Sequence, residues 1–210
     1  KPCLYLYRLI RQGNAQRGIV VVYHVEDYRQ NVIKKHEKTR QAPEDDRTKH
    51  ILATNAQTGP VFLAYRDSAV IDGIVARVEK EKPLYEFAAA DGVQHTIWKI
   101  DQPEPLVRAF KDVPVAYIAD GHHRAAAASR VARERNGAGD SEWAQGVLFP
   151  ASQLRILPYN RCVKDLNGLS PDKFLAAVRS VFRVSEKVDP QPTTPNHISM
   201  YLGGIWYGLT

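Results

Sequence analysis

Cysteine is scarce in this sequence, which has only Cys3 and Cys162 among its 210 residues. Neither cysteine belongs to a CxxC or CxxH pattern, so a structural zinc site is not expected. A reduced cytoplasmic protein is the simplest interpretation, and a disulfide between the two cysteines is the alternative. Long apolar runs are also missing, because no stretch reaches the roughly 18 apolar residues that a membrane-spanning helix needs.

Several catalytic signatures are absent as well. The sequence contains no HExxH, GxSxG, Walker or GxGxxG pattern, which argues against zinc proteases, serine hydrolases, P-loop NTPases and Rossmann dehydrogenases. The first residues, KPCLYLYRLIRQ, lack the layout of a signal peptide and are typical of a strand. The last residues have a hairpin pattern around Gly203-Gly204. Because both ends fall in expected β structure, we expect the chain to be part of a longer protein.

The charge balance is basic, with a net charge of +6 and a pI near 9.3. A positive protein favours anionic ligands. The basic residues are mixed with acidic ones, as in KKHEKTRQAPEDDRTKH, whereas a nucleic-acid interface usually gathers them on one stripe. Nucleic acid is therefore a secondary expectation.

The order of strand and helix patterns predicts an α+β fold, in which helices pack on a mixed sheet. Period-two alternation and turn residues predict strands at 4–10, 18–25, 60–65, 84–87, 95–100, 114–119, 145–149 and 155–157. Apolar residues on one face, together with residues typical of helix starts and ends, predict helices at 43–54, 68–81, 103–111, 122–135 and 170–182. The apolar strand at 114–119 is expected to be central. Residues 1–188 are expected to form one domain, and residues 189–210 a linker and the start of a further β segment.

The segment Asp120-Gly121-His122-His123-Arg124 lies between this apolar strand and an Ala-rich helix. A helix N-terminus leaves backbone N–H groups unpaired and carries a partial positive charge. Gly121 allows close approach to the backbone, and the planar Arg124 guanidinium suits two phosphate oxygens. His122 and His123 can exchange protons near neutral pH, and Asp120 can cap the helix or bind a metal. The pattern predicts a phosphate site, in preference to a plain helix cap with packed or solvated histidines.

A second charged cluster comprises HEKTR at 36–40 and EDDR at 44–47. Glu37 is a candidate general base, and Glu44 and Asp46 are candidate magnesium ligands together with Asp120. Arg40 and Arg47 are candidate phosphate contacts. The alternative is a solvated charged segment that ends in a helix N-terminus, which is the usual role of mixed charge runs.

Other polar residues give weaker signals. Arg161 in the PYNR segment is a candidate second anion contact, and a surface salt bridge is the equal alternative. His95 and Trp98 are three apart, so a strand points them to opposite faces, and Trp98 is expected in the core. His50 has no partner in sequence and is expected to be structural.

Taken in order, the motifs HExTR, EDDR, HxxW, YIADGHHRxxAA and LPYNRxVKDL resemble a widespread prokaryotic family of unknown function, over essentially the whole chain. The strand–DGHHR–helix element also resembles the ParB/sulfiredoxin superfamily, in which a Gly-containing turn with a basic residue binds nucleotide phosphates. That superfamily includes CTP-hydrolysing ParB proteins, ATP-using sulfiredoxins and a free-serine kinase. Sulfiredoxin chemistry is not expected, because the cysteine of its motif is missing, and no helix-turn-helix supports ParB-type DNA binding.

The second resemblance implies that residues 1–188 form a nucleotide-binding domain with the polyphosphate at Gly121, His123 and Arg124. The expected activity is a kinase-like phosphotransferase that uses ATP or ADP and magnesium on a small hydroxyl substrate such as L-serine. Glu37 or His122 would take the substrate proton. A nucleotide-binding regulatory module without turnover is the alternative, and a nucleic-acid-associated protein is the second alternative.

Overall fold

The computed structural model describes residues 3–157 and 159–210. The chain divides into two compact units, Lys1–Arg155 and Ile156–Thr210. This division differs from the expected boundary after residue 188, because strand β9 (Val184–Glu186) pairs with β11 (Ile205–Leu209) in the second unit. Pairing across the Pro/Thr-rich segment ties the residues before it to the C-terminal hairpin.

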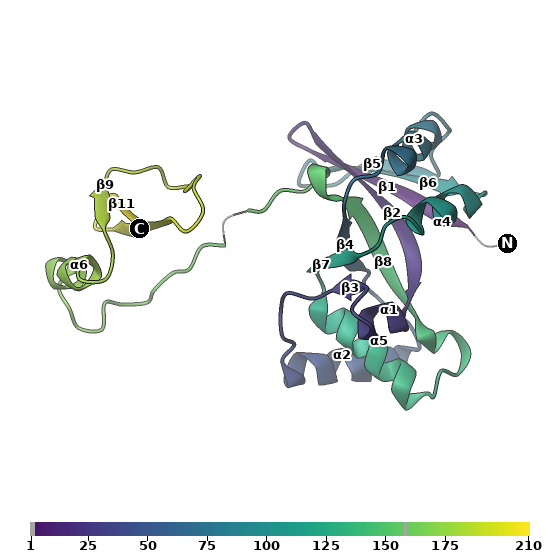
Figure 1. Cartoon of the computed structure of the whole chain (residues 1–210), viewed down its shortest axis with the longest axis horizontal. Helices are drawn as coiled ribbons and strands as arrows, with labels where there is room; N and C mark the ends of the chain where they lie inside the picture. The colour runs from purple at the N-terminus through teal and green to yellow at the C-terminus, as the bar shows by residue number, and fades with distance from the viewer. Residues whose placement is uncertain (1–2, 158) are drawn as a thin grey trace. The chain divides into compact units, whose positions relative to one another are not determined.

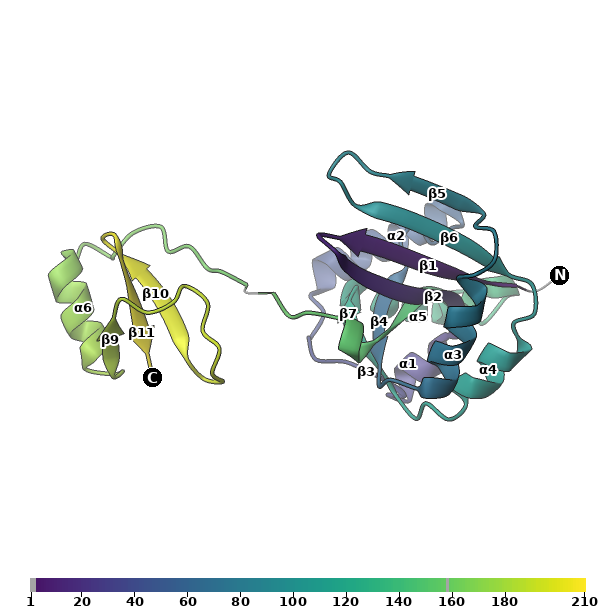
Figure 2. The same cartoon turned by 90° about the horizontal axis from the view of Figure 1, so that it is seen from above.

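The first unit is built on an eight-stranded mixed sheet with the order β3-β7-β4-β8-β2-β1-β6-β5 (Figures 1 and 2). The pairs β3–β7 and β4–β8 are parallel, and the others are antiparallel. This confirms the predicted α+β class with a mixed sheet. The strands are β1 (Leu4–Arg11), β2 (Asn14–His24), β3 (Ile33–Lys34), β4 (Val61–Tyr65), β5 (Tyr85–Ala88), β6 (Gln94–Ile100), β7 (Ala116–Asp120) and β8 (Trp143–Pro150).

Five α-helices belong to this unit, and the predicted helical segments all form. They are α1 (Val25–Arg29), α2 (Gln41–Thr54), α3 (Ala69–Val78), α4 (Glu104–Phe110) and α5 (His122–Glu134). Two short 3₁₀ turns, η1 (Gly139–Glu142) and η2 (Ala151–Gln153), flank β8. In the described residues, no helix is long and apolar enough to cross a membrane.

Two buried clusters fix the helices on the sheet. In the first, Ile71 of α3 and Leu106 of α4 pack against Leu6 and Trp98 of the sheet, which confirms the core position of Trp98. In the second, alanines of α5 pack against β4, β7 and β8. Ala125 and Ala127 are 1% and 0% exposed, so the small side chains bring the helix close to the strands. This contact holds the N-terminus of α5 at the end of β7.

Two strand predictions need correction. Strand β7 is not central, because its outer neighbour is only the two-residue β3, and Tyr117 is 40% exposed. Only Ile118 of this strand is buried, so the apolar run reflects one packed face rather than two. Residues 155–157 form no strand, and Ile156 is fully exposed.

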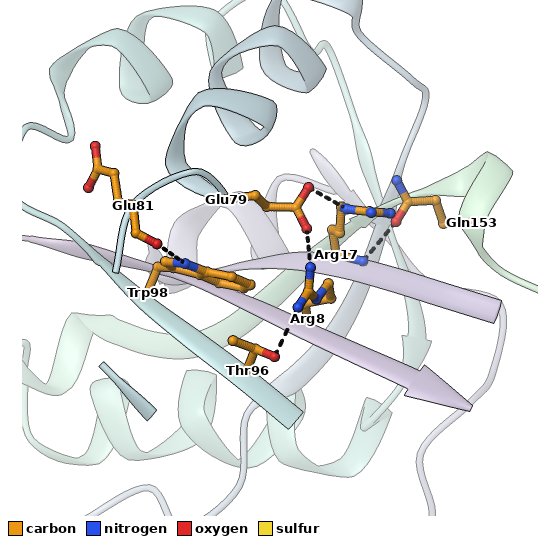
Figure 3. A network of polar contacts seen from close by, with 7 residues as sticks. All are labelled: Arg8, Arg17, Glu79, Glu81, Thr96, Trp98 and Gln153. Atoms are coloured by element: carbon orange, nitrogen blue, oxygen red, sulfur yellow. Dashed lines mark hydrogen bonds and ion pairs between the residues drawn. The ribbon is translucent and has the colours of Figure 1, made fainter. Parts of the chain in front are cut away.

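A polar network joins the C-terminal end of α3 to the first hairpin (Figure 3). Glu79 accepts from Arg8 at 3.2 Å and from Arg17 at 2.8 Å, and these arginines are directly opposite each other on β1 and β2. Arg8 also donates to Thr96 and lies 4.8 Å from the ring centroid of Trp98. One carboxylate therefore binds two cross-strand arginines and compensates part of their positive charge.

The second unit contains α6 (Pro171–Arg179) and the antiparallel sheet β10-β11-β9, with β10 spanning Ile198–Leu202. Ser170 caps α6, its hydroxyl accepting from the backbone N–H of Lys173, as the Ser-Pro-Asp start predicts. Tyr207 and Leu209 of β11 are buried. The predicted C-terminal hairpin is confirmed.

Candidate functional site

A cavity of about 340 Å³ opens at the N-terminus of α5, beside the end of β7. Three separate parts of the sequence contribute to it. Its polar lining consists of Glu37, Arg47, His50, Gln57, Thr58, Asp120, His122, His123 and Arg124, together with Gly59 and Gly121. The fold therefore brings the DGHHR segment together with two members of the charged cluster at 36–47.

The turn into α5 is made by Gly121, which has φ 97° and is the N-cap residue. This conformation is in the left-handed region that favours glycine. No side chain caps the helix, so the alternative in which Asp120 is a conventional cap is not observed. Backbone N–H groups of the first turn thus keep the donor capacity that suits an anion.

Arg124 lies between two glycines. A Cβ atom on Gly121 would be 2.7 Å from Nε of Arg124, and one on Gly59 would be 3.3 Å from its Nη1. Both glycines therefore leave space that the guanidinium occupies. Arg124 donates from Nη2 to Oδ2 of Asp120 at 2.6 Å, and the Asp120 side chain is 75% exposed. This ion pair holds the Arg124 guanidinium at the cavity, and the Asp120 carboxylate stays accessible.

His122 is the buried polar residue of the site, with 4% of its surface exposed. Its Nε2 accepts from the backbone N–H of His36 at 3.4 Å, so the ring proton belongs on Nδ1. Nδ1 lies 3.7 Å from Oε2 of Glu37. Burial, followed by the neighbouring His36 ring at 4.4 Å, lowers the pKa of His122. A neutral His122 therefore faces the carboxylate of Glu37 through its N–H group.

The second histidine anchors the segment before α2. Nε2 of His123 accepts from the backbone N–H of Arg40 at 3.1 Å, which places the ring proton on Nδ1. Arg40 thus contributes its backbone to the site, and its side chain is not among the cavity lining. Sequence reasoning assigned a phosphate contact to that side chain and could not foresee the backbone bond.

The predicted metal ligands do not come together. Glu44 accepts from the Thr39 hydroxyl at 3.0 Å, and Asp46 is exposed on α2. Only Asp120 of the three lines the cavity. Over residues 3–157 and 159–210, no group of three His, Cys, Asp or Glu side chains is placed to hold a metal ion. Glu44 and Asp46 instead belong to a helix whose Asp45 pairs with Arg130 of α5.

The remaining predicted anion contacts, Arg47 and Arg161, belong to different units of the chain. Arg47 of α2 lines the cavity, as expected. Arg161 belongs to the second unit, where its guanidinium lies 3.9 Å from the ring centroid of Tyr159. Pro158 of the same motif lies outside the described residues.

Besides the apolar Ile51 and Val61, four lining residues were not predicted for the site, namely His50, Gln57, Thr58 and Gly59. His50 is one helical turn after Arg47, so a spacing argument on α2 could have linked the two. The loop at 57–59 carries only a turn signal, in Gly59-Pro60 before β4. Its place beside Arg124 depends on the antiparallel pairing of β4 with β7.

The model of one protein family, described as proteins of unknown function (DUF1015), matches residues 1–210. The chain belongs to the DUF1015 family. No match was found among curated proteins or among solved structures. The family carries no activity with it, and the likeness to ParB and sulfiredoxin proteins stays a prediction.

For this DUF1015 member, the groups that line the cavity indicate which chemistry is available. Arg47, Arg124 and the first turn of α5 supply positive charge and N–H donors to the cavity lining. Glu37 supplies a carboxylate that is 56% exposed, next to a buried imidazole N–H. This arrangement can bind an anion and can accept a proton from a neighbouring hydroxyl group.

Proposed function

We propose that this protein is a nucleotide-dependent phosphotransferase. It binds the phosphates of ATP or ADP in the cavity and transfers a phosphoryl group to a small hydroxyl substrate such as L-serine. The observation that carries the proposal is the meeting of a cationic helix N-terminus with the Glu37–His122 pair in one cavity. Phosphoryl transfer requires chiefly charge stabilisation and positioning, which these groups supply.

Phosphate binding is assigned to Arg124, Arg47 and the backbone of α5. Gly121 exposes the backbone N–H groups, and the Arg124 guanidinium offers a planar pair of donors. His123 adds an Nδ1–H donor, because its Nε2 is occupied by Arg40. Together these groups distribute positive charge over a polyphosphate without a Walker loop.

Proton transfer is assigned to Glu37 rather than to His122. Both nitrogens of His122 have partners, since Nε2 accepts from His36 and Nδ1 faces Glu37. His122 therefore acts as a positioning residue that orients the carboxylate. Glu37 keeps an exposed oxygen for the substrate hydroxyl, and its removal of that proton generates the attacking oxygen.

Magnesium would arrive with the nucleotide, neutralising phosphate charge. Mg²⁺ keeps several waters and commonly binds one or two carboxylates plus phosphate oxygens. Asp120 is the predicted ligand that lines the cavity, and Glu37 is the other carboxylate there. The donor set fits a nucleotide-bound ion better than a resident one.

A second candidate is a regulatory module that binds a nucleotide without turnover. It is favoured by the ion pair between Asp120 and Arg124, because an incoming phosphate competes with Oδ2 of Asp120 for the Arg124 guanidinium. In this candidate, nucleotide binding rearranges the pair and the chemistry is absent.

The test is to mix the protein with ATP or ADP, magnesium and L-serine, and to follow phosphoserine by mass spectrometry. Phosphoserine formation that depends on nucleotide supports the kinase. Nucleotide binding by calorimetry with no turnover of L-serine or of other small hydroxyl compounds supports the regulatory module. If no nucleotide binds and none shifts the thermal midpoint, both candidate functions are excluded.

A further inference from the structure

A second and larger cavity, of about 860 Å³, adjoins the phosphate cavity. The two share Ile51 of α2 and Gln57 of the loop that follows this helix. A ligand that extends from Arg124 past Gln57 therefore enters the second cavity. The two hollows are neighbours, and the first contains Arg47 and Arg124 beside its carboxylates.

Gln57 defines the passage between the two cavities. Strand β4 pairs with β8 only from Gly146 onward. Before that point, the side chain of Gln57 makes the hydrogen bonds that a neighbouring strand would make. Its Nε2 donates to the carbonyl oxygen of Trp143 at 2.7 Å, and its Oε1 accepts from the N–H of Gln145 at 2.8 Å. Both ends of the amide are thus satisfied by β8, which fixes the loop and keeps the passage in one place.

Two exposed apolar side chains belong to the lining of the second cavity. Trp143 is 44% exposed and Val22 is 60% exposed, and both line the cavity. Val22 is directly opposite Gln145, so it is diagonal to Trp143 on the same face of the β2–β8 pair. The indole contacts His24 edge-on at 5.1 Å between ring centroids, which limits its rotation. A held, exposed indole is a surface on which an aromatic ring can stack.

We propose that this second cavity binds the base and ribose of the nucleotide, with the base stacked on Trp143. The inference rests on the proposed function, because it assigns the remainder of the ligand whose phosphates lie at Arg124. A purine is the expected base, since its two fused rings overlap an indole more fully than a single pyrimidine ring does. Polar groups of Asp140 and Gln145 in the same cavity are available to the ribose and to the base edge.

The experiment compares two ligands, ATP and inorganic tripolyphosphate, on the wild type and on Trp143→Ala and Trp143→Phe, by calorimetry. Trp143→Ala is expected to weaken ATP binding about tenfold, a typical effect of removing a stacked ring. Tripolyphosphate has no base, so its affinity is expected to stay unchanged. Trp143→Phe retains an aromatic face and is expected to recover most of the ATP affinity.

Tyr85→Ala is the matched control, because Tyr85 is an exposed aromatic residue on β5 that lines neither cavity. Thermal midpoints of all variants exclude loss of folding as the cause. Equal affinities of the wild type for ATP and tripolyphosphate, or an unchanged ATP affinity in Trp143→Ala, would overturn the base site alone. Absence of binding by both ligands would overturn this inference together with the proposed function.

Discussion

Two polar regions of the first unit hold their charges in opposite ways. In the network of Figure 3, Glu79 is 17% exposed and binds both Arg8 and Arg17, so its carboxylate is held inside the fold by two partners. At the cavity, Arg124 pairs with an Asp120 carboxylate that is 75% exposed, and Glu37 is 56% exposed. The first arrangement stabilises the contact between a helix and the sheet. The second keeps charged groups accessible to a ligand.

The contrast separates charges that are held inside the fold from charges that stay accessible at the cavity. A largely buried charge that is bound by its partners is costly to remove, because the partners then lose their compensating charge. An exposed pair contributes little to stability, since water screens it. Substitutions in the network are therefore expected to change stability and leave binding intact, and substitutions at the cavity are expected to do the reverse.

The largest expected effect is on the rate of phosphoryl transfer in Glu37→Gln. The amide cannot accept the substrate proton, so the rate is expected to fall by about 100-fold to 10,000-fold. Nucleotide affinity should change far less. Phosphoserine formation at saturating nucleotide measures the rate, with Glu86→Gln on the exposed strand β5 as the control. Full activity in Glu37→Gln would contradict the role of this carboxylate.

Next in size is the loss of nucleotide binding in Arg124→Ala. Removing a charged hydrogen-bond donor to phosphate is expected to weaken affinity by about 30-fold to 100-fold. Stability should change little, because the ion pair of Arg124 is with the exposed carboxylate of Asp120. Arg130→Ala is the matched control on the same helix, since Arg130 pairs with Asp45 and Glu134 away from the cavity. Calorimetry with ADP would show equal affinities for the two variants if the site were elsewhere.

Glu79→Ala tests the other half of the comparison. It leaves Arg8 and Arg17 without their shared carboxylate, and we expect a loss of about 2 kcal/mol in the free energy of unfolding. Urea denaturation measures this loss. Glu26→Ala, which breaks an exposed pair with Arg29, is the control and should cost about 0.5 kcal/mol. Similar losses in both variants would remove the distinction between the two regions.

Gly121→Ala combines both kinds of effect. The residue has φ 97°, and the added Cβ would be 2.7 Å from Arg124. We expect about 1–2 kcal/mol of destabilisation together with weaker nucleotide binding. Gly92→Ala is the control, because Gly92 has φ 80° with open space around it, so it carries backbone strain alone. A binding defect in Gly92→Ala would show that the strain acts indirectly.

The smallest expected effect is a pH dependence of stability from His122. Its pKa is lowered in the folded protein by burial and by His36, so the unfolded chain binds the proton more readily. Stability is therefore expected to fall as the pH drops below about 6.5, the ordinary pKa of histidine. Thermal midpoints at acidic and neutral pH measure this effect. The midpoint of His122→Gln should depend less on pH than that of the wild type. An identical dependence would assign it to other groups.

Local patterns in the sequence were enough to predict most elements and the centre of the site. The alternation in the first hairpin and the apolar spacing of α3 and α6 predicted these elements because each pattern repeats within one segment. Asp120 to Arg124 were identified for the same reason, since strand, glycine, helix start and arginine are consecutive. Partners far away in the sequence were harder to predict. Glu37 and Arg47 were correctly expected beside this turn, but Glu44 and Asp46, which were expected to bind a metal together with Asp120, do not line the cavity.

The sequence by itself determined the α+β class and a cationic turn with free helix N–H groups, because strand alternation, glycine and helix capping act over a few residues. Only the tertiary structure decided that Glu37 lies beside His122, that the loop with Gln57 joins two cavities, and that β7 lies near the sheet edge. Those features depend on strand order and on which helix packs on which face. They arise from contacts between residues far apart in the chain, which local patterns do not encode.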